Sequence, residues 1–172
     1  MVLKIFLLGE FRLQAGAQAV PLRSRPAQSL LAYLALHSGM AQRRERLAGL
    51  LWPEATESNA RSYLRQSLWR VRKALNAAGL RPEDYLQTSD LSLTLDPAAP
   101  IWLDTAEFLA TPASAPKSEL AAALALYRGD MLPGFYDEWV TAERERLHAA
   151  YQQRMQALLD ALLAAGAWDE GL

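Results

Sequence analysis

The residues from Asn59 to Leu75, NARSYLRQSLWRVRKAL, carry five basic side chains and no acidic one, although the whole chain of 172 residues has a formal net charge of only −1. Arginine and lysine neutralise phosphate groups, and arginine, asparagine, glutamine and serine also bond with base edges. Apolar residues recur in this segment at the spacing of one helical face, namely Leu64, Leu68, Val71 and Leu75. The segment is therefore predicted to be an amphipathic helix with the chemistry needed to bind nucleic acid.

The helical wheel puts most of the polar side chains opposite this apolar stripe. These are Asn59, Ser62, Gln66, Trp69, Arg70 and Lys73, with Arg61, Arg65 and Arg72 along one flank. Taken alone, the pattern is equally typical of a solvated surface helix, because arginine is a good helix former that keeps its charge in water. Trp69 is predicted either to contact a ligand or to be buried under a neighbouring element.

The residues needed for enzymatic chemistry are scarce. The chain has no cysteine, which excludes a disulfide, a thiolate metal site and a cysteine nucleophile. Its two histidines, His37 and His148, are predicted to have structural or solvent-exposed roles. Neither Gly-x-x-x-x-Gly-Lys-Ser/Thr nor Gly-x-Gly-x-x-Gly is present. The sequence therefore predicts no enzyme, no cofactor and no metal site.

Charge is distributed unevenly along the chain. Residues 1–100 hold 13 basic and 8 acidic residues, a net charge of +5, whereas residues 101–172 hold 5 and 11, a net charge of −6. The proline-bounded stretch DPAAP at 96–100 separates the two parts and is typical of a linker. We therefore expect two domains, residues 1–97 and 101–172, with different partners. No apolar stretch is long enough to span a membrane, which predicts a cytoplasmic protein.

The first hundred residues predict strands, then three helices, then a hairpin. Short apolar stretches within residues 2–22 predict a three-stranded meander. Helical periodicity follows over residues 24–38, with Ser24 as the expected N-cap and Gly39 as the stop. The segment RRERLAGLLWP predicts a second, shorter helix with Leu47, Leu50 and Leu51 inward.

The basic segment forms the third predicted helix. Thr56 or Ser58 is a suitable N-cap, and the helix is expected to end near Gly79. Two strand-forming runs on either side of Ser89-Asp90 predict a hairpin over residues 85–95. The order of these elements is that of a helix-turn-helix with a wing.

These residues carry a resemblance to a known family. The stretch LLGEFRLQAGAQAVPLRSRPAQSLLAYLALHSGMAQRRERLAGLLWPEATESNARSYLRQSLWRVRKAL resembles the DNA-binding part of the Streptomyces antibiotic regulatory protein family, whose winged helix is of the OmpR type. The resemblance covers residues 2–96. It implies that residues 57–78 are the recognition helix, which enters the major groove, and that residues 85–95 are the wing. Family wings often end in Gly-Tyr-x-Leu, whereas this chain has Leu91-Ser92-Leu93 there.

Residues 101–172 are predicted to be helical throughout. Asp104 and Glu107 have the spacing of a capping box, a second helix is expected to end at Gly129, and a long amphipathic helix is expected over residues 138–165. This order resembles the bacterial transcriptional activator domain, an all-helical, tetratricopeptide-like module that usually follows such a winged helix. The ERER run at 143–146 is predicted to be a solvated face. Residues 166–172 predict a turn and the start of another helix, so we expect the chain to be a truncated piece of a longer regulator.

The predicted function is a sequence-specific DNA-binding transcriptional regulator; an activator is favoured, and the sequence leaves repression open as the alternative. The resemblance implies binding to direct repeats in double-stranded DNA and recruitment of RNA polymerase. A homodimer on DNA is one possible assembly, and the sequence leaves the oligomeric state open. An alternative function is a protein-interaction adaptor that uses the helical C-terminal half. Arg43 and Arg44 suit DNA-backbone contacts and equally suit solvated charges. The expected DNA-binding residues are Arg43, Arg44, Asn59, Arg61, Ser62, Arg65, Gln66, Trp69, Arg70, Lys73, Thr88 and Ser89.

Overall fold

The computed structural model describes residues 1–166 and divides the chain into two compact units. Unit 1 comprises Met1–Phe6 and Phe11–Leu103, and unit 2 comprises Leu7–Glu10 and the residues from Asp104 onward. This division differs from the expected domain limits at 97 and 101, because the first unit extends to Leu103 and the second takes in a short N-terminal segment. The additional helix expected at the end of the chain lies outside the described residues.

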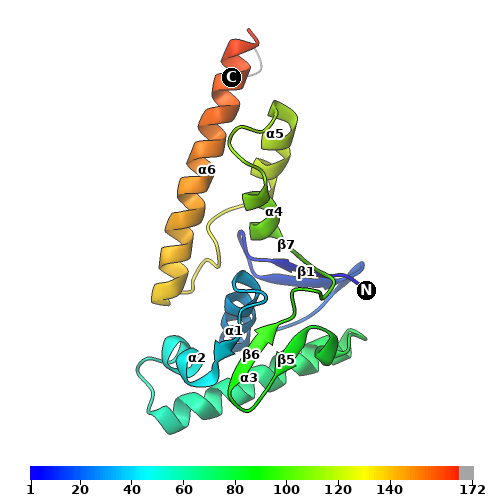
Figure 1. Cartoon of the computed structure of the whole chain (residues 1–172), viewed down its shortest axis with the longest axis vertical. Coiled ribbons are helices and arrows are strands. Elements are labelled where there is room, and N and C mark those ends of the chain that lie inside the picture. The colour runs from blue at the N-terminus through cyan, green and yellow to red at the C-terminus, as the bar shows by residue number, and fades with distance from the viewer. Residues whose placement is uncertain (167–172) are drawn as a thin grey trace. The chain divides into compact units, whose positions relative to one another are not determined.

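A four-stranded sheet opens unit 1 (Figure 1). Its strands are β1 (Leu3–Phe6), β2 (Arg12–Ala15), β3 (Gln18–Ala19) and β7 (Ile101–Leu103), in the order β3-β2-β1-β7. The first three form the predicted antiparallel meander. The sequence did not predict β7, which pairs in parallel with β1 where a linker and a new domain were expected. Leu3 and Ile5 are buried on the inner face, and Lys4 is exposed on the other, as alternation along a strand requires.

Three helices follow the meander and pack against one another: α1 (Arg25–Leu36), α2 (Arg44–Leu51) and α3 (Glu57–Ala77). Ser24 occupies the N-cap position of α1, but its side chain makes no capping hydrogen bond there. In α2 the predicted inward residues Leu47 and Leu51 are buried, whereas Leu50 is only half-buried and Ala48 is buried instead. At the end of α1, Gly39 has a φ of +80°, which glycine adopts without strain, and its amide donates to the carbonyl of Leu95 at 2.9 Å.

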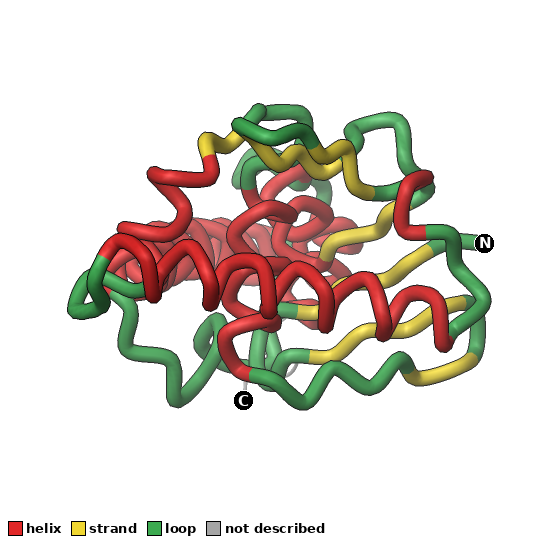
Figure 2. Tube along the Cα trace, turned by 90° about the horizontal axis from the view of Figure 1, so that it is seen from below, coloured by secondary structure: helices red, strands yellow, loops and turns green. Residues whose placement is uncertain are grey.

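The predicted hairpin is present as β5 (Leu86–Thr88) and β6 (Ser92–Leu95), preceded by a 3₁₀ turn at Pro82–Asp84. A third, unpredicted strand, β4 (Gln42–Arg43), pairs with β6 just before α2 begins, which gives the order β4-β6-β5. Figure 2 shows α3 as one long unbroken helix with this hairpin alongside it. Unit 1 therefore has the α+β arrangement of a winged helix-turn-helix, as the sequence predicted.

Up to residue 166, unit 2 contains three helices, α4 (Asp104–Ala110), α5 (Lys117–Leu126) and α6 (Glu138–Ala164), which confirms the predicted helical region. Asp104 has a structural role: its carboxylate accepts hydrogen bonds from the backbone amides of Leu7 and Leu8, each at 2.9 Å. These bonds, and a bridge between Leu8 and Met131, incorporate the segment from residue 7 to residue 10 into this unit.

Two arginines on α6 bond to backbone carbonyls of unit 2. Arg154 is buried, with its guanidinium 4.8 Å from the ring centre of Phe108, and it donates to the carbonyls of Leu109, Thr111 and Ala150. Burial lowers the pKa of Arg154 from its usual value. Through these charge-assisted hydrogen bonds Arg154 connects the end of α4 and the loop after it to α6.

Arg144 has a comparable role in the loop that precedes α6. It donates to the carbonyls of Met131 at 2.7 Å and Phe135 at 2.8 Å, and also to that of Leu132, whose φ of +49° is unusual for a residue with a side chain. The expectation that residues 143–146 form only a solvated face was therefore wrong for Arg144. It was right for Arg146, which is exposed and pairs with Glu143 at 2.8 Å.

We expect Arg144→Ala to lower the free energy of unfolding of this unit by about 2–4 kcal/mol, because three carbonyls lose a charged donor. Arg146→Ala removes the same side chain from an exposed ion pair and should cost less than about 1 kcal/mol. Urea denaturation followed by circular dichroism measures both. Equal, small effects of the two variants would contradict the role assigned to Arg144.

Candidate nucleic-acid interface

The orientation of α3 is set by its N-terminus and by its apolar stripe. Thr56, rather than Ser58, is the N-cap, because its hydroxyl oxygen accepts a hydrogen bond from the amide of Asn59 at 3.3 Å. The helix ends before Gly79, whose φ is +73°. All four residues of the predicted stripe are buried, namely Leu64, Leu68, Val71 and Leu75. Burial of this stripe points the opposite face outward.

The outward face of α3 contains most of the predicted site. Trp69 has 57% of its surface exposed, which excludes the buried alternative for this side chain. Arg70 and Arg72 are half-buried. The remaining predicted residues of the helix are exposed, namely Asn59, Arg61, Ser62, Arg65, Gln66 and Lys73. Between Ser58 and Ala77 the helix has no acidic residue, so this face is cationic along its length.

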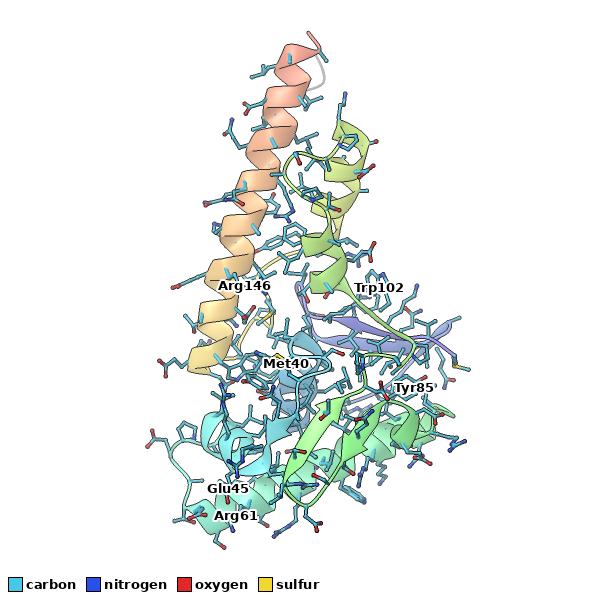
Figure 3. All side chains as sticks on the ribbon, in the orientation of Figure 1. Met40, Glu45, Arg61, Tyr85, Trp102 and Arg146 are labelled. Carbon is cyan, nitrogen blue, oxygen red and sulfur yellow. The ribbon has the colours of Figure 1, made fainter. Side chains whose placement is uncertain are left out.

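Acidic side chains partly compensate the charge at the N-terminal end of this face. Arg61 pairs with Glu57 one turn earlier and with Glu45 of α2, the latter at 3.4 Å (Figure 3). Both acids are largely exposed, so these ion pairs are weak and exchange readily with other anions. Arg61 therefore needs little energy to leave its partners for a phosphate.

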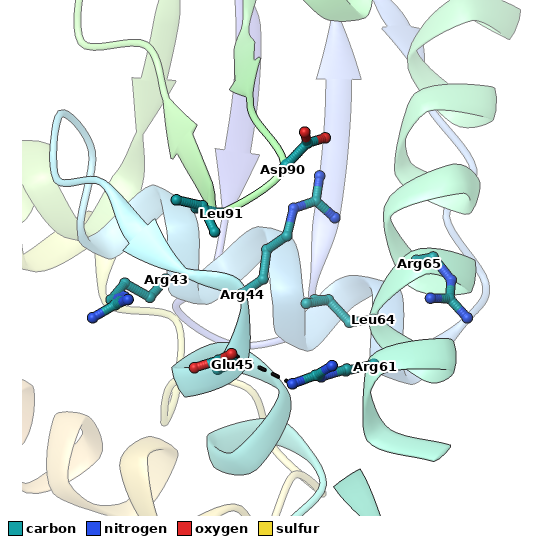
Figure 4. Close-up of a pocket in the computed structure, with 8 residues that line it drawn as sticks. All are labelled: Arg43, Arg44, Glu45, Arg61, Leu64, Arg65, Asp90 and Leu91. Atoms are coloured by element: carbon teal, nitrogen blue, oxygen red, sulfur yellow. Dashed lines mark hydrogen bonds and ion pairs between the residues drawn. The ribbon is translucent and has the colours of Figure 1, made fainter. Parts of the chain in front are cut away.

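A cavity of about 420 Å³ lies between α2, α3 and the turn of the β5–β6 hairpin (Figure 4). Arg44, the first residue of α2, donates from Nε to the carbonyl of Ser89 at 2.8 Å. Burial lowers the pKa of Arg44, and repulsion by Arg72 and Arg65 adds to this effect, whereas Asp90 opposes it. The lining residues are Arg43, Arg44, Glu45, Arg61, Leu64, Arg65, Asp90 and Leu91. Four arginines against two acids make this cavity suited to an anion.

The hairpin turn is bonded to the helices by polar groups. Arg72 donates from Nη2 to the hydroxyl oxygen of Thr88 at 2.7 Å. The hydroxyl of Ser89 accepts from the amides of Leu91 at 3.2 Å and Ser92 at 3.0 Å, which closes the turn. Thr88 and Ser89 are exposed as predicted, but both also hold the turn in place. The sequence did not predict that Arg72 holds the hairpin turn. Its position on the arginine flank of the helix was the one signal that could have indicated this role.

A groove of about 690 Å³ lies on the other flank of α3. The ammonium group of Lys73 is 4.9 Å from the centre of the Trp69 ring, and Arg70 donates to the hydroxyl of Ser24 at 2.9 Å. The groove is lined by Pro21, Leu22, Arg23, Ser24, Trp69, Arg70, Lys73, Ala74 and Ala77. Cations therefore border both sides of the outward face, and no acidic residue lines this groove.

Other chemistry has little support in the part of the chain that the structure describes. No group of three potential metal ligands occurs within residues 1–166. The ring of His37 stacks on Tyr33 at the end of α1, and His148 lies on α6 beside Gln152. None of the helices within the same range is long and apolar enough to cross a membrane.

The architecture is that of a winged helix-turn-helix followed by a helical region. A family model described as the bacterial transcriptional activator domain matches residues 107–172. Comparison with curated proteins found no match.

Comparison with solved structures supports the fold. EmbR from Mycobacterium tuberculosis, in a structure described as a complex with a low-affinity phosphopeptide, superimposes with a TM-score of 0.84 at 23% sequence identity. The superposition covers 95% of this chain and 46% of that one, so this chain spans about half the length of the EmbR chain. Both parts of the architecture implied by the resemblance to the Streptomyces antibiotic regulatory protein family are thus confirmed.

We expect Thr56→Ala to destabilise unit 1 by about 1 kcal/mol, because the amide of Asn59 loses its N-cap acceptor. Ser58→Ala removes a hydroxyl two residues further along the chain and should change stability by less than about 0.5 kcal/mol. Thermal unfolding of the two variants compares them directly. The cap assignment fails if Ser58→Ala is the more damaging change.

Proposed function

We propose that this chain is a sequence-specific regulator that binds double-stranded DNA with α3 in the major groove and activates transcription. The observation that carries the proposal is the outward face of α3, which is exposed, cationic and rich in side chains able to bond with base edges. An α-helix with its side chains is about 10–12 Å across, and the major groove is about 12 Å wide, so the helix fits.

Within this proposal the residues form two groups, one that contacts base edges and one that contacts the sugar-phosphate backbone. Asn59, Ser62, Arg65 and Gln66 lie on the N-terminal half of the outward face and bond with base edges. The remaining residues contact the sugar-phosphate backbone on either side, namely Arg43, Arg44, Arg61, Trp69, Arg70, Lys73, Thr88 and Ser89. Thr88 already accepts from Arg72 and still has its own hydroxyl proton to donate to a phosphate oxygen.

The acidic helical unit is proposed to make the protein contacts. The formal net charge of residues 101–172 is −6, which disfavours contact with DNA and suits a basic protein surface. In the regulator that we propose, two copies occupy direct repeats as a homodimer on DNA, and this unit contacts RNA polymerase. The cell compartment of this function is the cytoplasm.

The adaptor function is the second candidate. Tyr136 of unit 2 has 88% of its surface exposed, and an exposed aromatic side chain is a common anchor at protein interfaces. An adaptor would use this surface, and its basic helix would bind an acidic protein instead of DNA. The two functions differ in how affinity depends on salt and on DNA sequence.

The first experiment selects a duplex from a randomised pool and titrates it by fluorescence anisotropy at several salt concentrations. If five cations each neutralise one phosphate, the log–log slope of affinity against salt should be about −4.5. The selected duplex should bind at least about a thousandfold more tightly than random DNA. Equal binding to every duplex, or no binding, would support the adaptor and refute the regulator.

The second experiment separates base contacts from backbone contacts on the outward face. Arg65→Ala and Gln66→Ala should each cost about 1–3 kcal/mol on the selected duplex and relax its preference, because base contacts are lost. Arg70→Ala and Lys73→Ala should weaken selected and scrambled duplexes alike and reduce the salt slope by about 0.9 each. Titration of each variant on both duplexes measures these effects.

Two exposed residues of α6 provide matched controls for these variants. Gln153→Ala removes an amide as Gln66→Ala does, and Arg146→Ala removes one positive charge as Lys73→Ala does. Both controls should bind each duplex like the unmodified chain. If all four α3 variants also behave like the unmodified chain, the assignment of this face to DNA is wrong.

A further inference from the structure

The β5–β6 hairpin lacks the positive charge with which protein segments usually bind the phosphate backbone of DNA. From Leu86 to Leu95 the sequence LQTSDLSLTL contains no lysine or arginine, and Asp90 is its one charged residue. The most exposed apolar side chain of the hairpin is Leu91, which stands in the turn with 72% of its surface accessible. The hairpin therefore presents an apolar group where a cation would be expected.

The position of Leu91 is fixed by hydrogen bonds on every side of the turn. Its own amide donates to the hydroxyl of Ser89, and its carbonyl accepts from the amide of Arg44 at 2.9 Å. The guanidinium of Arg44 holds the carbonyl of Ser89, and that of Arg72 holds the hydroxyl of Thr88. Because two helices fix the turn, the exposed side chain needs little further ordering on binding.

Asp90 does not prevent this turn from approaching DNA. Asp90 is one of the residues that line the cavity beside Arg44, and its charge opposes the lowering of the pKa of Arg44 (Figure 4). Arg44 at the start of α2 therefore offsets part of the negative charge at the turn, and Leu91 is the uncharged group beside it.

We propose that Leu91 enters the minor groove next to the site that α3 reads, and that Arg44 and Arg72 are the residues that position it. The proposal rests on the DNA-binding function proposed above. A leucine side chain forms no hydrogen bond with a base edge, so it discriminates between sequences through how easily the duplex deforms around it. Apolar side chains that press between base steps favour flexible pyrimidine–purine steps and bend the duplex.

The test uses two duplexes that share the selected site and differ only in the flanking minor-groove step, TA in one and a rigid A-tract in the other. Affinity is measured by anisotropy, and bending by energy transfer between labels on the duplex ends. The unmodified chain should prefer the TA duplex by about tenfold and bend it. Leu91→Ala should abolish the preference and the bend, and leave the salt slope unchanged.

Two further substitutions of exposed side chains sharpen the result. Met40→Ala removes a comparably exposed apolar side chain elsewhere in unit 1 and should retain the preference and the bend. Leu91→Arg adds a cation and should steepen the salt slope by about 0.9 without restoring the preference for the TA duplex. If Leu91→Ala keeps both the preference and the bend, the inference is overturned while the proposed function stands. If neither the unmodified chain nor any variant binds a duplex, the inference and the proposed function both fail.

The positioning role has a separate readout. Thr88→Val removes the acceptor of Arg72 without changing the side-chain volume much, and Thr88→Ser restores an acceptor. Thr88→Val should lose the preference for the TA duplex at an unchanged salt slope, and Thr88→Ser should regain it. Arg72→Ala should lose the preference for the TA duplex to the same extent as Thr88→Val. The variant that combines Arg72→Ala with Thr88→Val should lose no more of this preference than either single variant. An Arg72 that acts only as a phosphate ligand would instead lower the salt slope by about 0.9 and leave the flank preference intact.

Discussion

The rest of unit 1 depends on the burial of one apolar stripe along α3. Four side chains at helical spacing, Leu64, Leu68, Val71 and Leu75, are removed from water against α1 and α2. At about 1.5–3 kcal/mol for each fully buried side chain of this size, no other rotation of the helix is competitive. The rotation that buries the stripe also turns the cationic side chains outward. Core packing and the candidate interface are thus two results of one periodic pattern.

Arginine has three distinct roles in this chain. Arg144 and Arg154 donate to backbone carbonyls at the end of α4 and in the loops of unit 2, so they maintain the fold of that unit. Arg44 and Arg72 join the hairpin turn to the helices. Arg65, by contrast, is exposed on the outward face of α3. The side chain serves all three purposes because its planar group offers five donors and keeps its charge when partly desolvated.

The elements with strong local periodicity could be predicted from the sequence. The three helices of unit 1, the meander, the hairpin and the long α6 are all present close to their expected limits. The outward residues of α3 followed from the same periodicity. The strands β4 and β7 could not be predicted, because a strand of two or three residues has no periodicity of its own and exists through its partner. For β7 that partner lies almost a hundred residues away.

The roles of individual polar side chains also could not be predicted from their neighbours in the sequence. Arg144 and Arg146 are two residues apart in the same run, and only the loop that passes beside Arg144 makes their environments different. Ser24 has the residue type and position of an N-cap, yet its hydroxyl accepts from Arg70, 46 residues later in the chain. Such bonds are determined by tertiary packing, which sequence spacing does not encode.

The interleaving of the two units bears on how the protein can be dissected. A fragment that stops at residue 100 loses β7, and the edge of β1 is then left with unpaired amides and carbonyls that invite pairing with another chain. A fragment that starts at residue 104 keeps the carboxylate of Asp104 but loses the amides of Leu7 and Leu8 that it accepts from. Neither piece is a faithful copy of its unit, because each unit draws on residues from both ends of the range 1–104.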